Sequence, residues 1–131
     1  PCDYLVQIHS IAPLLTRAEI GAFTDKLVSG GYGTLLSGVN EQIQCMMEDA
    51  PLNFSRDGMD ATQELKPVQR ISWSITGWNA KSYVETFEAG GCATFHGEMG
   101  FFPLSRPSGL VIKYEEDYKM ATAMAAAGLG E

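Results

Sequence analysis

Long apolar runs are absent from this chain: nowhere in its 131 residues do about 18 apolar residues follow one another, the length that spans a bilayer. The first residues also lack a basic region followed by an apolar stretch, the pattern of a secretory signal. We therefore expect a cytoplasmic protein that makes no contact with a membrane.

Basic residues are scarce as well. The chain has 9 Lys and Arg against 16 Asp and Glu, a formal net charge of −7, and its basic residues form no cluster. Such a chain repels the phosphate backbone of nucleic acids. We therefore expect no nucleic-acid partner, and the charge argues for solubility.

Only three cysteines are present, Cys2, Cys45 and Cys92, and no CxxC pair. An odd number without that spacing predicts neither a disulfide framework nor a zinc site, so we expect reduced thiols. His96 stands near Cys92 and Glu98, but their spacing matches no standard zinc pattern. The sequence also lacks a GxGxxG or Walker loop, and it therefore predicts neither a metal nor another cofactor.

Apolar residues, in contrast, are sufficient for a core, at 45% of the chain. The length suits a single domain over residues 1–131, since domains commonly have about 100–150 residues. A chain of this size buries roughly two-thirds of its unfolded surface and needs no disulfide to fold.

The first half of the chain predicts a strand, a helix and a second strand. Residues 4–11 alternate apolar and polar, which is typical of a strand. Thr16 and Glu19 form a capping-box pattern at the start of a helix, and Gly30-Gly31 ends it. Residues 42–48 alternate again and predict the second strand, parallel to the first.

The second half predicts the same order of elements. Residues 70–76 alternate, Asn79 is suited to cap a following helix, and Gly90-Gly91 ends that helix. Residues 110–114 form an apolar run that predicts a fourth strand, while residues 120–130 predict a helix or a frayed end.

Together these patterns predict an α/β (α+β) fold built from two β-α-β units, with a four-stranded mixed sheet and two helices on one face. The first unit covers residues 1–50, a connecting loop 51–67, the second unit 68–117 and a C-terminal tail 118–131. The order of elements repeats but the residues barely do, so the duplication is structural.

Pro1 is the first candidate for chemistry. A free N-terminal proline is a secondary amine, and a model α-amino group titrates near about 7.7–8. Burial or a neighbouring cation disfavours its ammonium form, so such an amine can move a proton between carbon and oxygen at pH 7. It can also attack a carbonyl to form an iminium. Alternatively, Pro1 is an exposed chain end without a role.

Several features of the first half resemble the tautomerase superfamily. Pro1 opens directly into a strand that contains Gln7-Ile8-His9, and the second predicted strand begins about forty residues later. That strand ends in Met47-Glu48-Asp49-Ala50-Pro51 and continues into Asn53-Phe54 and Gly58, as the family's strand does. The resemblance, to the long members with two fused β-α-β units, covers nearly the whole chain.

The resemblance implies a cofactor-free tautomerase or isomerase that uses the Pro1 amine as general base or nucleophile on a carbonyl or enol substrate. It also implies a homotrimer. Ile11 stands where short family members carry a substrate-binding arginine, and Trp78 and Asn79 stand where the dehalogenases of the family carry arginines. Other cations are therefore expected to hold the substrate.

The predicted substrate-binding residues are Arg106, Lys113, Tyr114, Trp78 and Asn79. Arg106 precedes the predicted fourth strand, much as a substrate-binding arginine precedes the second strand in short tautomerases. Lys113 and Tyr114 lie on that strand, where they either face solvent and pack, or stabilise an oxyanion. Trp78 contributes an aromatic wall to an apolar pocket, or packs at an interface.

Apolar faces of the predicted strands indicate self-association. The residues concerned are Tyr4, Val6, Ile8, Ile71, Trp73 and Ile75. Helices would cover one face of the sheet, and exposing the other is unfavourable by roughly 25 cal/mol per Å².

Two alternatives stay open at this stage. The first is a ferredoxin-like α/β-barrel binding module without a catalytic amine. The second is a cofactor-free monooxygenase or isomerase of the dimeric α/β-barrel type, whose pocket would lie between helices and sheet.

Overall fold

The computed structural model describes residues 2–59 and 61–130. The elements along the chain are β1 (Tyr4–Ile8), α1 (Arg17–Gly30), β2 (Thr34–Glu41), β3 (Met46–Met47), β4 (Ala50–Pro51), the 3₁₀ turn η1 (Thr62–Glu64), β5 (Val68–Asn79), α2 (Ala80–Glu88), the 3₁₀ turn η2 (Ala93–Phe95), β6 (Met99–Pro103) and α3 (Glu115–Ala126). Within the described residues, no helix is both long and apolar enough to cross a bilayer.

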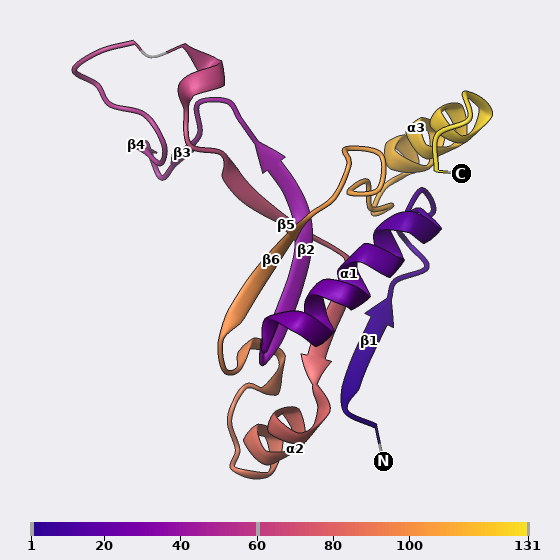
Figure 1. Cartoon of the computed structure of the whole chain (residues 1–131). Helices are drawn as coiled ribbons and strands as arrows, with labels where there is room; N and C mark the ends of the chain where they lie inside the picture. The colour runs from indigo at the N-terminus through magenta and orange to yellow at the C-terminus, as the bar shows by residue number, and fades with distance from the viewer. Residues whose placement is uncertain (1, 60, 131) are drawn as a thin grey trace.

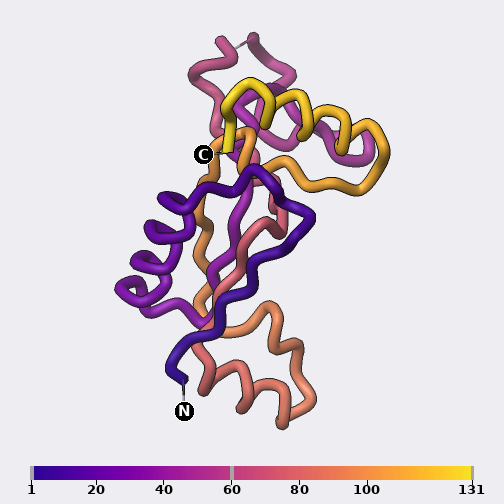
Figure 2. The backbone as a smooth tube through the Cα atoms, turned by 90° about the vertical axis from the view of Figure 1, so that its right-hand side faces the viewer, coloured from indigo at the N-terminus to yellow at the C-terminus, as the bar shows by residue number. Residues whose placement is uncertain are grey.

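Four of the strands form one mixed sheet in the order β1-β5-β2-β6 (Figure 1). β1 and β2 both run antiparallel to β5, and β6 runs parallel to β2. α1 packs beside the strands, as Figure 2 shows, and α2 lies at the end of the sheet where β1 begins and β5 ends. The prediction of an α+β fold with a four-stranded mixed sheet and packed helices is confirmed.

The predicted ends of α1 are also confirmed. Thr16 Oγ1 accepts a hydrogen bond from the Glu19 amide at 3.2 Å, and the Glu19 carboxylate accepts one from the Thr16 amide at 3.4 Å. At the other end Gly31 adopts the left-handed conformation with φ 67°. These local hydrogen bonds and the glycine mark the two ends of the helix.

The second strand lies earlier than predicted. β2 begins directly after Gly33, and residues 34–39 are buried on both faces, so their sequence shows no alternation. β1 and β2 run in the same direction but are not neighbours, because β5 is long enough to pair with both and lies between them. The predicted pair of adjacent parallel strands is therefore replaced by a split unit.

The fourth strand was predicted at residues 110–114, which is wrong. β6 occupies Met99–Pro103 and runs opposite to β5, so the second half is not a parallel β-α-β unit. In the segment before α3, the amides of Lys113 and Tyr114 both donate to the Asp117 carboxylate at 2.9 Å. These backbone donors cap a helix and are not available to a sheet.

The C-terminal tail contains a regular helix. α3 spans Glu115–Ala126, so of the two predictions for residues 120–130 the helical one is confirmed over most of that range. Ala121 is its buried residue, and it lies in a small apolar hollow that Leu14 and Ile112 also line.

The hydrophobic core lies between α1 and the sheet. Phe23 and Leu27 of α1 are fully buried against Leu35 and Ile75 of the two central strands. Gly77 lets the helix approach closely, because a Cβ at this position would stand 2.5 Å from a Leu27 methyl group. The missing side chain of Gly77 is therefore a packing requirement of this core.

Residues 42–59 and 61–67 project from the sheet as an arm that contains β3, β4 and η1 (Figure 1). The side chain of Asn53 joins its two sides: Oδ1 accepts from the Cys45 amide at 2.8 Å, and Nδ2 donates to the carbonyls of Ile43 at 2.8 Å and Lys66 at 2.9 Å. The predicted strand 42–48 is wrong except for β3, and the arm begins well before the predicted loop at residue 51.

Candidate functional site

The principal catalytic prediction, Pro1, lies outside the described residues. The segment that follows it is tied to the start of α2, since the Ala80 amide donates to the Asp3 carbonyl at 2.9 Å. Tyr4 pairs with Asn79 at the same end of the sheet. Two predicted substrate-binding residues, Trp78 and Asn79, therefore lie near the beginning of β1.

The indole N–H of Trp78 and the amide oxygen of Asn79 are engaged within the fold. Trp78 is buried, its Nε1 donates to the Thr94 carbonyl at 3.1 Å, and its ring meets Tyr83 edge to face at 5.5 Å. Asn79 Oδ1 accepts from the Ser82 amide at 3.0 Å, which confirms the predicted N-cap. Their role in substrate binding stays a prediction.

A serine–histidine contact lies beside them, and no sequence pattern predicted it. His96 is buried; its Nδ1 lies 2.6 Å from the Ala93 carbonyl and its Nε2 lies 2.8 Å from Ser82 Oγ. A carbonyl only accepts, so Nδ1 carries the proton in the neutral ring and Ser82 donates to Nε2. Because Ser82 Oγ also lies 3.1 Å from Asn79 Oδ1, the contact joins η2 to the cap of α2.

The other three predicted substrate-binding residues come together at a different place. Arg106, Lys113 and Tyr114 line one cleft of about 470 Å³ between the start of β5, the end of β2, the segment after β6 and α3. We name it the cation cleft. Its charged and hydroxyl-bearing aromatic residues are Glu41, Arg70, Arg106, Lys113, Tyr114 and Asp117.

Glu41 organises the cations of this cleft. Its Oε1 lies 2.9 Å from Arg70 Nε, and its Oε2 lies 3.7 Å from an Arg106 amino group. The Glu41 side chain is 24% exposed, whereas the two arginines are 53% and 75% exposed. One partly buried carboxylate thus contacts two largely exposed guanidinium groups, each of which has further N–H donors.

The second carboxylate of the cation cleft, Asp117, accepts hydrogen bonds from the backbone. Hydrogen bonds from the Lys113 and Tyr114 amides lower the pKa of Asp117, which caps α3. The cleft therefore contains three cations against two carboxylates, with both carboxylates engaged by groups of the protein. In a chain with net charge −7 and 9 basic residues, this is a local excess of positive charge.

Apolar side chains form the remaining wall of the cation cleft. They come from β5, the segment before α3 and α3 itself: Ile71, Trp73, Leu110, Val111, Met120 and Met124. A cleft with an apolar wall and a few converging polar groups is the usual form of a small-molecule site.

Sequence reasoning missed Arg70, Glu41 and Trp73. Arg70 opens β5, and neither it nor Glu41 is singled out by the sequence. Neither residue carries a local signal, because Glu41 meets Arg70 and Arg106 only through pairing of β2 with β5 and the return of the segment after β6. Trp73 was predicted on an ordinary strand face. The backbone conformation that places it in the cleft depends on the register between β2 and β5.

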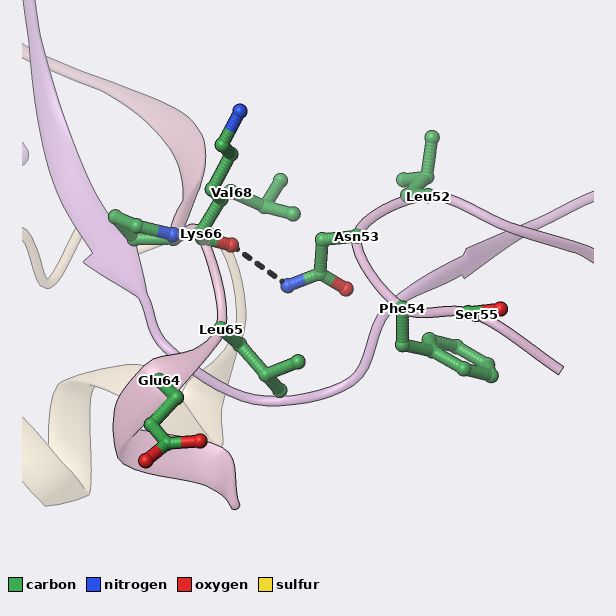
Figure 3. A pocket seen from close by; sticks show the side chains of 9 residues that line it. Leu52, Asn53, Phe54, Ser55, Glu64, Leu65, Lys66 and Val68 are labelled. Carbon is green, nitrogen blue, oxygen red and sulfur yellow. Dashed lines mark hydrogen bonds between the residues drawn. The ribbon is translucent and has the colours of Figure 1, made fainter. Parts of the chain in front are cut away.

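A second and larger cleft of about 660 Å³ lies in the arm (Figure 3). Its ionisable lining residues are Glu64 and Lys66, and Figure 3 shows their charged ends pointing in opposite directions. The Asn53 carboxamide in its centre is already hydrogen-bonded to Lys66 and to the opposite side of the arm. This cleft therefore offers fewer polar side chains to a ligand than the cation cleft does.

In residues 2–59 and 61–130, no three His, Cys, Asp or Glu side chains lie where they could hold a metal ion. The three cysteines are free thiols. No protein-family model matches the chain, and no curated protein matches it significantly.

Proposed function

We propose that this protein binds a small acidic carbonyl or enol compound in the cation cleft. The observation that carries the proposal is the shared contact of Arg70 and Arg106 with Glu41. It brings two guanidinium groups together at one wall of a cleft whose other wall is apolar.

The chemistry of the lining suits an anionic oxygen. A guanidinium presents five N–H donors, so each arginine keeps donors for a ligand after contacting Glu41. Hydrogen bonds between charged partners are about twice as strong as neutral ones. The exposed Tyr114 hydroxyl and Lys113 ammonium, which line the same cleft, are suited to stabilising charge on an enolate oxygen.

Replacing Arg106 or Arg70 by glutamine is expected to weaken binding of 2-oxohexanoate by about 10- to 100-fold, because a hydrogen bond to a charged group contributes about 1.5–3 kcal/mol. Isothermal titration calorimetry with this 2-oxo acid measures the change. 2-Hexanone, which has the ketone and no carboxylate, is expected to bind far more weakly.

The matched control is Lys119→Gln, which removes a cation of α3 that pairs with Glu115 at 3.6 Å and does not line the cleft. It is expected to leave the affinity unchanged. Equal binding of the acid and the ketone, or an affinity that neither arginine variant changes, would contradict the proposal.

An enzymatic reaction through the Pro1 amine is the second candidate, as a cofactor-free tautomerase or isomerase. The hydrogen bond from Ala80 to Asp3 favours it, because it holds the N-terminal segment beside Trp78 and Asn79. The stretch of β5 from Arg70 to Asn79 is about 30 Å if fully extended. A site that combined residues from both ends of β5 would therefore need side chains from two copies of the protein, in line with the predicted homotrimer.

Replacing Pro1 by alanine, or extending the chain before it, is expected to slow keto–enol interconversion of 2-oxohexanoate by about 100-fold or more, the usual contribution of a general base. Ultraviolet absorbance of the enol follows the reaction. Cys2→Ser, which keeps the terminal amine, is the control. Turnover that survives both changes rules out this mechanism, and binding without any turnover favours the binding-module alternative.

A further inference from the structure

Trp73 has an unusual backbone conformation for a large side chain. Its φ is 62°, in the left-handed region. Among the described non-glycine residues, only Glu48 and Asp49 share a positive φ, and they form the turn between β3 and β4. Trp73 instead lies in the middle of β5, where an extended conformation is the rule.

A bulge in β5 explains how the chain reaches this conformation. Leu36 pairs with Thr76, but Gly38, two residues later, pairs with Ile71. Four residues of β5, numbers 72–75, therefore stand opposite the single residue 37 of β2. Bulges re-aim a side chain, and they are over-represented next to active sites.

The residues on both sides of Trp73 are fixed inside the protein. Ser72 Oγ and Ser74 Oγ lie 2.9 Å apart, and Ser74 Oγ donates to the Ser108 carbonyl at 2.8 Å. Both serines are buried, whereas Trp73 is only partly buried and lines the cation cleft. The bulge thus buries two small polar side chains next to a partly exposed indole, and Ser72 and Trp73 both line the cleft.

The indole is also held from the side. Its ring centroid lies 5.8 Å from that of Phe95 with an interplanar angle of 58°. Met120 and Met124 of α3 also line this cleft. Methionine side chains are flexible and make favourable contacts with aromatic rings, so this wall accepts a flat apolar group.

We infer that the ligand of the cation cleft is an aromatic acid whose ring packs on Trp73 while its carboxylate meets Arg70 and Arg106. This inference rests on the proposed function and adds the class of ligand. A strained residue persists only where its surroundings over-determine it, and such residues cluster at binding sites. A tryptophan that merely filled space would need neither the bulge nor the left-handed conformation.

The test compares phenylacetate with cyclohexylacetate, which differ in the flatness of the ring and share the carboxylate. Phenylacetate is expected to bind about three- to tenfold more tightly, from the gain of an aromatic pair. Trp73→Leu removes this preference, and Trp73→Phe retains part of it. Phe87→Leu, the matched control at an exposed aromatic residue of α2 that does not line the cleft, leaves the preference intact.

Titration calorimetry measures all affinities, and circular dichroism checks that each variant is folded. Equal affinities of the two acids for the unaltered protein would overturn this inference but leave the proposed function standing. A preference for phenylacetate that survives Trp73→Leu would have the same consequence. If phenylacetamide binds as tightly as phenylacetate, or no acid binds, the proposed function itself fails. Because Trp73→Phe keeps a ring of similar shape, it preserves the test if the leucine variant unfolds.

Discussion

Replacing Phe23 by alanine is expected to lower the free energy of unfolding by about 3–5 kcal/mol. The Phe23 side chain is fully buried between α1 and the sheet, and its ring meets Phe102 edge to face at 5.5 Å. Truncation removes this apolar burial and leaves a cavity that α1 cannot close, because the Leu27 side chain already lies against Gly77. The loss is a large part of the stability of an ordinary domain, about 5–15 kcal/mol.

Urea unfolding followed by circular dichroism measures this effect. Val28→Ala is the matched control on the same helix, since its side chain is 53% exposed, and we expect it to change stability by less than about 1 kcal/mol. A loss below about 1 kcal/mol for Phe23→Ala would show that α1 does not form the core described above.

Replacing Glu19 by alanine is expected to lower the free energy of unfolding by about 2–4 kcal/mol, from a lost cap and the lost hydrogen bonds to a charged carboxylate. Glu19 Oε2 accepts from Thr16 Oγ1 at 2.8 Å and from the buried Ser108 hydroxyl. Its Oε1 accepts from the Ser105 amide at 2.8 Å. One carboxylate therefore joins the start of α1 to the segment after β6.

The same carboxylate predicts a dependence on pH. Burial alone would raise the pKa of Glu19, but hydrogen bonds from Ser108, Ser105 and Thr16 outweigh burial and lower it. The unfolded chain then binds the proton more readily than the folded one, so the contribution of Glu19 is fully present above the ordinary pKa of about 4.3. It is lost as the pH falls through the lower pKa of the folded state.

Unfolding experiments from pH 7 to pH 3 test this on the unaltered protein and on Glu19→Gln, which keeps the size of the side chain and cannot ionise. The difference in stability between the two is expected to shrink as the pH falls. Glu88→Gln, at an exposed position of α2, serves as control. A difference that stays constant with pH would mean that the charge of Glu19 contributes nothing to the network.

A double-mutant cycle with Ser108→Ala separates the hydrogen bond from the general effect of truncation. If Ser108 and Glu19 act together, the two losses do not add. Additive losses would instead assign the effect of Glu19 to the cap of α1 and to the Ser105 amide.

The elements with local signals were predicted correctly. Thr16 and Glu19 cap α1, Gly31 ends it and Asn79 caps α2, because each of these features depends on residues within four positions of one another. Strand positions failed where burial on both faces removed alternation, as in residues 34–39, or where an apolar run preceded a helix, as in residues 110–114.

Three of the five predicted substrate-binding residues line one cleft, but not on the element that was expected to present them. Arg106, Lys113 and Tyr114 line one cleft, yet the strand that was expected to present the last two is an irregular segment before α3. Trp78 and Asn79 lie at the other end of β5. All five residues were predicted to lie in one site. Sequence spacing could not separate them, because it does not show which end of a strand a residue occupies.

Composition and local pattern by themselves determined the class of fold, the caps of both predicted helices and the scarcity of positive charge. Those properties depend on near neighbours in the chain or on simple counts. The tertiary structure alone decided that β5 separates β1 from β2, that Glu41 joins two arginines, and that a bulge turns Trp73 into their cleft. Each of these depends on strand order and register, which are set by the burial of side chains distant in sequence.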